Sequence, residues 1–168
     1  LCVCAAMNAA PSEAVTKLRL GNKMIEDHYE SQALKMMAEN VKTRTNGEVE
    51  IQCYFGEVLG DNKKQIENMV RGVQDFYADG YYDMYSPLVR VSSLPYLFRD
   101  NEHYRHFLLS DVEKEIEEPL LKKAGLRVVD RKRNWLRGPF RVIASRKPIR
   151  SLEDLQGLKL RMNSNPIS

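Results

Sequence analysis

The stretch RKPIRSLEDLQGLKLR, residues 146–161, predicts the end of a strand, a short helix and the start of another strand. Pro148 cannot donate a backbone hydrogen bond and therefore ends the extended run before it. Ser151 is placed to cap the helix, and two acidic residues follow in the first turn, where they complement the helix dipole. A new strand then begins at residues 159–162. This alternation of strands and helices is typical of an α/β fold.

The first eighty residues show the same alternation over a longer stretch. Strands are predicted at residues 17–21, 49–55 and 73–78, with amphipathic helices between them that start near His28 and after Asp61. Asp27 is placed to cap the first helix, and Gly72 ends the second. Three strands separated by two helices imply parallel pairing with right-handed crossovers. The predicted class is therefore α/β.

Two further helices are predicted in the middle of the chain, after a compact apolar plug at residues 94–98. The first begins at Asn101 and the second at Asp111, and Gly125 is a natural stop for the second. Pro119 removes a backbone donor and should bend this second helix. The apolar positions predicted to face the core are Tyr104, Phe107 and Leu108 in the first helix and Val112, Ile116 and Leu120 in the second.

Residues 127–130 and 140–145 have strand character and are interpreted as strands that cross between two lobes. On this interpretation residues 15–126 form a first α/β lobe, and residues 127–168 supply the crossing strands and the start of a second lobe. The boundary near Leu126 follows from the order of the elements, because no flexible linker or internal repeat marks it.

Residues 1–14, LCVCAAMNAAPSEA, resemble the end of an export signal, with Ser12-Glu13-Ala14 as a small-x-small cleavage site. We therefore expect this segment to be removed and the protein to lie outside the cytoplasm. Cys4 raises the alternative of a lipidation site, although Val3 stands where a small residue is usual. Cys53 is then alone in the remaining chain, so neither a disulfide framework nor a metal site of cysteine pairs is expected. No later run approaches the ~20 apolar residues that span a bilayer.

Composition and motifs argue against a nucleic-acid-binding protein and against an enzyme. Lys and Arg exceed Asp and Glu by three residues, 26 against 23, so the chain lacks the strong positive field of nucleic-acid binders. The basic run at residues 127–137 is interpreted as a solvated strand edge and loop, with phosphate binding and stacking by Trp135 as the alternative. His28, His103 and His106 lack a neighbouring nucleophile or metal-ligand pattern, and no dinucleotide-binding or P-loop motif is present. No metal, cofactor or catalytic residue is predicted.

The order of several short motifs resembles that of the solute-binding proteins of tripartite ATP-independent periplasmic (TRAP) transporters. Residues 146–161 closely resemble a signature region of that family, and the resemblance extends back through residues 58–61 (VLGD), 72–76 (GVQDF) and 94–96 (LPY). Each motif alone recurs in unrelated folds. Their order and spacing carry the resemblance, which covers about residues 17–162.

This resemblance implies a periplasmic-binding-protein-like fold of two α/β lobes, joined by crossing strands and a long helix, that closes around a ligand. On this comparison the chain contains the first lobe and the start of the second. The implied function is that of a periplasmic protein that delivers a small organic acid to a TRAP membrane permease, with no catalysis, no cofactor and no nucleic acid as partner. A dicarboxylate, a sugar acid, a keto acid and a sialic acid all remain possible ligands. A truncated remnant that binds nothing is the alternative.

The resemblance also assigns residues to the ligand. Arg161, at the end of Gly-Leu-Lys-Leu-Arg, matches a family position that binds the ligand carboxylate, and Arg141 matches a second arginine about twenty residues earlier. A guanidinium offers paired donors that fit a carboxylate and keeps its charge in a desolvated cleft. Two loops that lie at the cleft in relatives add possible contacts, Lys23 and Glu26 in one and Tyr81 and Tyr82 in the other. For the tyrosines, a position that faces solvent is the alternative.

Overall fold

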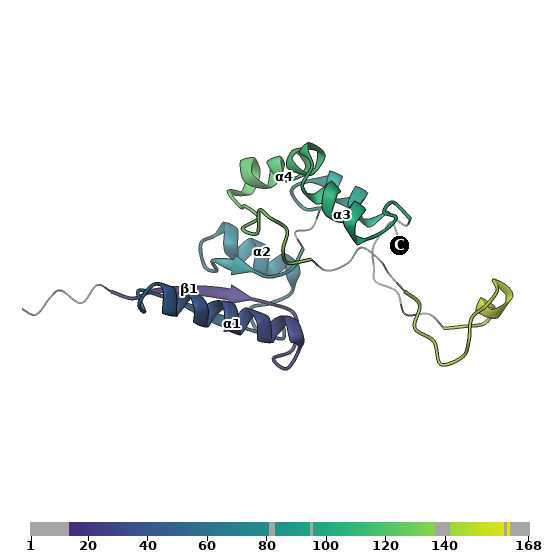
Figure 1. The fold of residues 1–168 in the computed structure, drawn as a ribbon, viewed down its shortest axis with the longest axis horizontal. Coiled ribbons are helices and arrows are strands. Elements are labelled where there is room, and N and C mark those ends of the chain that lie inside the picture. The colour runs from purple at the N-terminus through teal and green to yellow at the C-terminus, as the bar shows by residue number, and fades with distance from the viewer. Residues whose placement is uncertain (1–13, 81–82, 95, 137–141, 160, 162–168) are drawn as a thin grey trace, which may run out of the picture. The chain divides into compact units, whose positions relative to one another are not determined.

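The computed structural model describes residues 14–80, 83–94, 96–136, 142–159 and 161 of the chain (Figure 1). It falls into two compact units, Leu1–Tyr81 and Tyr82–Ser168. The lobe boundary near Leu126 stays a prediction.

The first unit is built on a parallel sheet of three strands, as the sequence predicted. The strands are β1 (Thr16–Gly21), β2 (Val49–Tyr54) and β3 (Phe76–Tyr77), in the order β2-β1-β3. β1 pairs with β2 over its full length, and Leu20 and Gly21 pair with the two residues of β3. The third strand is shorter than expected. Just before it the Asp75 N–H still donates to the Arg19 carbonyl (3.1 Å), but side chains take part in the neighbouring hydrogen bonds. The Arg19 backbone N–H donates to the Asp75 carboxylate (2.7 Å), and the Arg19 guanidinium donates to the Val73 carbonyl (3.3 Å).

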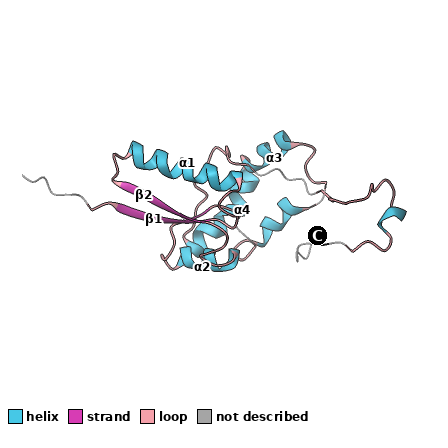
Figure 2. Ribbon diagram, turned by 90° about the horizontal axis from the view of Figure 1, so that it is seen from below, coloured by secondary structure: helices cyan, strands magenta, loops and turns pink. Residues whose placement is uncertain are grey.

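Two helices cover opposite faces of this sheet, α1 (Tyr29–Arg44) and α2 (Asn62–Val70) (Figure 2). Helix α2 starts directly after Asp61, as predicted, and the Asp61 carboxylate caps it by accepting from the Lys64 N–H (2.9 Å). The cap predicted for α1 is wrong, because His28 takes that place and its Nδ1 accepts from the Glu30 N–H (3.3 Å). The chain is still in a turn at Asp27, with the His28 N–H bonded to the Ile25 carbonyl (3.0 Å), so the helix starts one residue later.

The core of this unit is small and partly polar. Its buried apolar side chains among the described residues are Leu20 of β1, Leu34 of α1 and Ile66 of α2. Gln65 and Gln74 are also buried, and the Gln74 side chain donates to Gln65 Oε1 (3.0 Å) and to the Phe76 carbonyl (2.8 Å). Gln65 Nε2 in turn donates to the Gly60 carbonyl (2.8 Å). These glutamines lie against the end of β1, at Gly21.

Gly21→Ala is expected to lower the free energy of unfolding by about 2–3 kcal/mol, because overpacking a buried site and breaking a buried hydrogen bond are each costly. An added Cβ would overlap Gln65 Oε1 and come within 2.7 Å of Gln74 Nε2. Urea unfolding of the complete protein measures the change. Gly80→Ala is the matched control, since no atom lies within 4 Å of its Cβ position, and it should leave stability nearly unchanged. Equal effects of both variants would contradict the glutamine contact.

The second unit begins with a short 3₁₀ helix, η1 (Pro87–Ser93), and continues with α3 (Asn101–Leu108) and α4 (Asp111–Ala124). Of the predicted apolar plug before α3, Phe98 is buried, with its ring 4.8 Å from that of Tyr104, and Pro95 lies outside the described residues. Leu94 and Leu97 are exposed, and Tyr96 is fully so. Tyr96 has a left-handed backbone (φ 60°), which interrupts the extended run, so the segment cannot turn all its side chains to the core.

Helix α4 ends as predicted, at Gly125 in the left-handed conformation (φ 69°), but its buried face differs from the expected one. Ile116 and Leu120 are buried, whereas Val112 is 54% exposed and Glu113 is buried in its place. The reason is an arginine outside the helix. Arg133 pairs with Glu117 and lies 4.0 Å from Glu113, which turns this edge of α4 inward.

The crossing strands predicted at residues 127–130 and 140–145 are not formed in the part of the chain that the structure describes. A strand needs a neighbour for its backbone groups. Residues 129–135 form turns instead, in which the Asp130 carbonyl accepts from the Arg133 N–H (3.2 Å) and its carboxylate accepts from the Trp135 N–H (2.6 Å). Residues 142–145 are irregular, and residues 137–141 lie outside the described part of the chain.

The helix predicted after Pro148 is a single 3₁₀ turn, η2 (Glu153–Leu155), and the Ser151 cap is wrong. The bonding runs in the opposite sense, because the Asp154 carboxylate accepts from the Arg150 N–H (2.8 Å) and the Ser151 N–H (3.0 Å). The backbone hydrogen bond from Arg150 is the main cause of a lowered pKa of Asp154, and the one from Ser151 adds to it. Lys159 is not in a strand.

Candidate functional site

The carboxyl edge of the parallel sheet is the place in the first unit where a ligand site is expected. In open α/β sheets, ligands bind where neighbouring strands send their connections to opposite faces. Here β1 leads into α1 on one face and β2 leads into α2 on the other (Figure 2). β1 lies between the two other strands, so all three carboxyl ends meet around the residues that follow Gly21.

Asn22 joins these strand ends and is 1% exposed. Its side-chain Nδ2 donates to the Ala78 carbonyl after β3 (2.7 Å), and its Oδ1 accepts from the Met24 N–H (2.6 Å). Its backbone N–H donates to the Tyr54 carbonyl at the end of β2 (2.9 Å). Sequence analysis did not predict this role for Asn22. The available signal was an amide side chain placed directly after a buried strand.

An ion pair lies next to Asn22. Lys23 Nζ is 2.5 Å from Asp79 Oδ2, and the Gly80 N–H donates to Asp79 Oδ1 (2.7 Å). The Lys23 side chain is 27% exposed and that of Asp79 is 8% exposed. The structure therefore brings Lys23, a predicted ligand contact, to the carboxyl edge. Asp79 comes from the loop after β3 and was not among the predicted site residues.

Glu26, the other predicted contact in this loop, bonds to α1. It accepts a hydrogen bond from Lys35 Nζ (2.7 Å), and its side chain is 69% exposed. That hydrogen bond, together with the positive charge of Lys35, holds the pKa of Glu26 below its usual value. The carboxylate is thus engaged by Lys35, and its contact with a ligand stays a prediction.

The predicted arginines and tyrosines belong to parts of the chain that the structure describes sparsely. Arg161 is exposed and lies in irregular structure within the second unit. Arg141, Tyr81 and Tyr82 lie outside the described residues. The roles of these four residues stay predictions.

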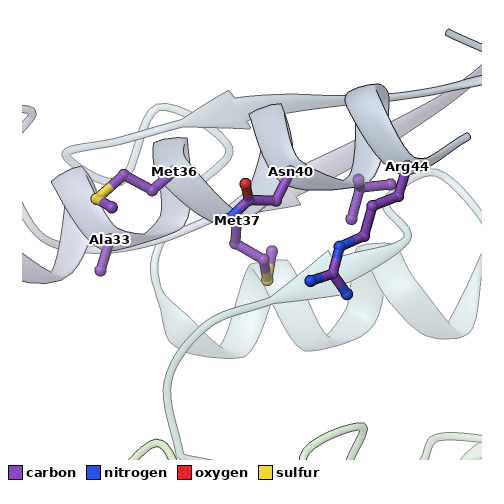
Figure 3. Close-up of a pocket in the computed structure, with 6 residues that line it drawn as sticks. Ala33, Met36, Met37, Asn40 and Arg44 are labelled. Atoms are coloured by element: carbon purple, nitrogen blue, oxygen red, sulfur yellow. The ribbon is translucent and has the colours of Figure 1, made fainter. Parts of the chain in front are cut away.

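A groove of about 450 Å³ runs along α1 (Figure 3). Its lining residues all come from this helix: Ala33, Met36, Met37, Asn40, Val41 and Arg44. Ligand pockets enclose most of a ligand's surface, which one helix face cannot do. The groove also contains none of the predicted ligand-binding residues. The carboxyl edge of the sheet is therefore the better candidate site.

Two other kinds of functional feature are absent from the residues that the structure describes. No group of three or more His, Cys, Asp or Glu side chains is arranged to hold a metal ion. Among the same residues, no helix combines the length and apolarity needed to cross a membrane.

Residues 20–168 match the model of the family described as bacterial extracellular solute-binding protein, family 7. The chain belongs to this family. The resemblance to TRAP solute-binding proteins is thereby confirmed. Members of this family bind solutes for transport, and several of the relatives that this chain matches are named as periplasmic proteins.

Two curated members of family 7 illustrate the similarity. The sialic acid-binding periplasmic protein of Vibrio cholerae is 30% identical over 156 residues, which are 92% of this chain and 47% of that protein. The 2,3-diketo-L-gulonate-binding periplasmic protein of Escherichia coli is 29% identical over 159 residues, which are 94% of this chain and 47% of that protein. The chain thus spans about half the length of the curated relatives that it matches.

Solved structures of TRAP periplasmic solute-binding proteins share the fold. One from Pseudomonas putida F1, with bound D-glucuronate, has a TM-score of 0.66 and 27% identity, over 89% of this chain and 49% of that one. One from Sulfitobacter sp. NAS-14.1, with bound β-D-galacturonate, has a TM-score of 0.57 and 25% identity, over 64% of this chain and 37% of that one. The predicted α/β fold, present in part, is confirmed.

Proposed function

We propose that the complete protein captures a small organic acid in the periplasm and delivers it to a TRAP membrane permease. The observation that carries this proposal is the family 7 match over residues 20–168, together with what the similar proteins bind. Sialic acid, 2,3-diketo-L-gulonate and D-glucuronate are chemically different, but each has a carboxylate. A carboxylate is therefore the group that the ligand of this protein would share with them.

In this proposal Arg161 and Arg141 bind the carboxylate through paired, charge-assisted hydrogen bonds. Lys23 contacts the remainder of the ligand, with Glu26, Tyr81 and Tyr82 as additional contacts. The geometry that supports a role for Lys23 is its place at the carboxyl edge, next to the buried Asn22. Reversible capture needs no reaction step, so the proposal includes no catalytic residue, metal or cofactor.

Nucleic-acid binding by the basic run at residues 127–137 is less well supported. Arg131 and Arg133 are both paired with Glu117 of α4, at 3.2 Å for Arg131. Paired guanidiniums have fewer donors left for phosphates.

The proposal predicts that at least one organic acid stabilises the complete protein against heat. A ligand at a hundred times its dissociation constant adds about 2.7 kcal/mol to the free energy of unfolding, which raises the melting temperature by several degrees. A thermal-shift screen of sugar acids, keto acids, dicarboxylates and sialic acids measures this. The methyl ester of each active acid is the control and should have little effect. No shift with any acid would favour the alternative of a remnant that does not bind.

A further inference from the structure

We propose that the Lys23–Asp79 ion pair makes this protein prefer hydroxylated acids with one carboxylate over dicarboxylates. The inference rests on the proposed function and names the ligand class for the same site. It concerns the part of the ligand that reaches the carboxyl edge of the sheet, not the carboxylate assigned to the arginines.

The first argument is the charge of the pair. Lys23 Nζ lies 2.5 Å from Asp79 Oδ2, so the two opposite charges are in direct contact. Together they present no net charge to a ligand. Asp79 is 8% exposed, so water screens its charge poorly. A lone lysine at this edge would attract a second carboxylate. The paired lysine does not, since an incoming carboxylate meets the negative charge of Asp79 as well.

The second argument is that the pair is held in place from both sides. Asn22 precedes Lys23 and donates to the carbonyl of Ala78, which precedes Asp79. The Gly80 N–H fixes the other carboxylate oxygen of Asp79 (2.7 Å). Lys23 would have to leave a nearly buried carboxylate to bind a second acid group elsewhere, and an unpaired buried charge is costly. The pair should therefore persist when a ligand binds.

The third argument is hydrogen-bonding capacity. An ammonium group has three N–H donors, and the 27% exposure of the Lys23 side chain leaves it accessible to a ligand. A hydroxyl group can accept from Lys23 and donate to a neighbouring acceptor, whereas a carboxylate can only accept. Lys23 therefore offers a ligand an N–H donor whose positive charge is already matched by Asp79, which fits a neutral hydroxyl group better than a second carboxylate.

A charge series tests this inference on the complete protein with two probes, D-gluconate and D-glucarate. Both have the same six-carbon skeleton and C1 carboxylate, and they differ in C6, which is a hydroxymethyl group or a second carboxylate. Calorimetry gives the ratio of their dissociation constants. We expect the parent protein to bind D-glucarate about tenfold or more weakly than D-gluconate. Asp79→Asn, which leaves Lys23 unopposed, should reduce this ratio by about tenfold.

Two other variants make the Lys23–Asp79 pair net negative or neutral. Lys23→Gln should increase the ratio, and the double variant Lys23→Gln/Asp79→Asn, again neutral, should return it to within about threefold of the parent. Lys23→Gln supplies the test if Asp79→Asn does not fold. Asp111→Asn is the matched control, since it breaks the exposed Lys114–Asp111 pair (2.7 Å) in the other unit, and it should leave the ratio unchanged.

The outcomes separate this inference from the proposed function. The inference is wrong, and the proposed function stands, if the parent binds acids but the ratio of the two dissociation constants is the same in all charge variants. The same holds if the parent prefers D-glucarate. The inference is also wrong if the parent binds other acids but neither probe. If the parent binds no organic acid at all, the proposed function fails and the inference fails with it.

Discussion

Arg161→Ala is expected to weaken binding of the cognate acid by the complete protein more than about a hundredfold. The physical reason is that a ligand carboxylate bound by Arg161 would lose two charge-assisted hydrogen bonds, each worth about 1.5–3 kcal/mol. The carboxylate would still lose its hydration on entering the site, with no partner to compensate for it. Arg161→Lys should weaken binding by roughly tenfold to a hundredfold, because an ammonium keeps the charge but not the paired planar donors. Calorimetry with the acid found by thermal shift measures both variants.

The control for Arg161 is Arg150→Ala. Arg150 is an exposed neighbour whose backbone N–H, not its side chain, bonds to Asp154, so this variant should bind the acid as the parent does. Folding should be nearly unaffected in all three variants, since Arg161 is exposed as well. If Arg161 is an ordinary surface residue, its variants will bind within about twofold of the parent, because an exposed charge contributes at most about 1 kcal/mol. That result would remove Arg161 from the proposed site.

The parts of the fold that the sequence predicted correctly depend on neighbours in the chain. Helix α2 starts directly after Asp61, which bonds to a residue three positions later, and Gly125 ends α4 through its own backbone conformation. The parallel order of the strands also follows from the alternation of strands and helices, because right-handed crossovers leave few other arrangements. Signals of this kind act over a few residues and are visible in the sequence.

The features that the sequence did not predict depend on partners far along the chain. Lys23 was expected at the site, but its pairing with Asp79 depends on β1 and β3 lying side by side, with Leu20 opposite Phe76. The same pairing brings Asn22 to Ala78. Nothing local to Asp79 distinguishes it from other aspartates in loops. The sequence therefore predicted one member of the ion pair, Lys23. The other member, Asp79, is identified only by the register of the sheet.

The error at the last 3₁₀ turn has a different cause, because two neighbouring side chains can each serve as the cap. Ser151 could accept from the N–H of residue 154, and Asp154 can accept from the N–H of residue 151. The structure has the second arrangement, and the same carboxylate also accepts from the Arg150 N–H. A carboxylate that accepts two N–H bonds is the stronger acceptor. The spacing alone is symmetrical and did not distinguish the two.

Arg133→Ala is expected to lower the free energy of unfolding of the second unit by about 3 kcal/mol, since removing one partner of a mostly buried ion pair leaves the other charge uncompensated. The Arg133 side chain is 13% exposed, pairs with Glu117, lies 4.0 Å from Glu113, and donates through Nε to the Leu108 carbonyl at the end of α3 (3.3 Å). It therefore ties the loop after α4 to both helices. Urea unfolding, with hydrogen exchange of the α3 and α4 amides, measures the loss and its location.

Arg131→Ala is the matched control for the contacts of Arg133, because Arg131 pairs with the same Glu117 at 3.2 Å but its side chain is 67% exposed. Its replacement should cost less than about 1 kcal/mol. Arg133→Lys should recover part of the loss, since a lysine can face one carboxylate but cannot also reach the Leu108 carbonyl with a second fixed donor. Equal destabilisation by Arg131→Ala and Arg133→Ala would show that burial does not set the strength of this contact. Faster exchange confined to residues outside α3 and α4 would show that Arg133 does not hold these helices.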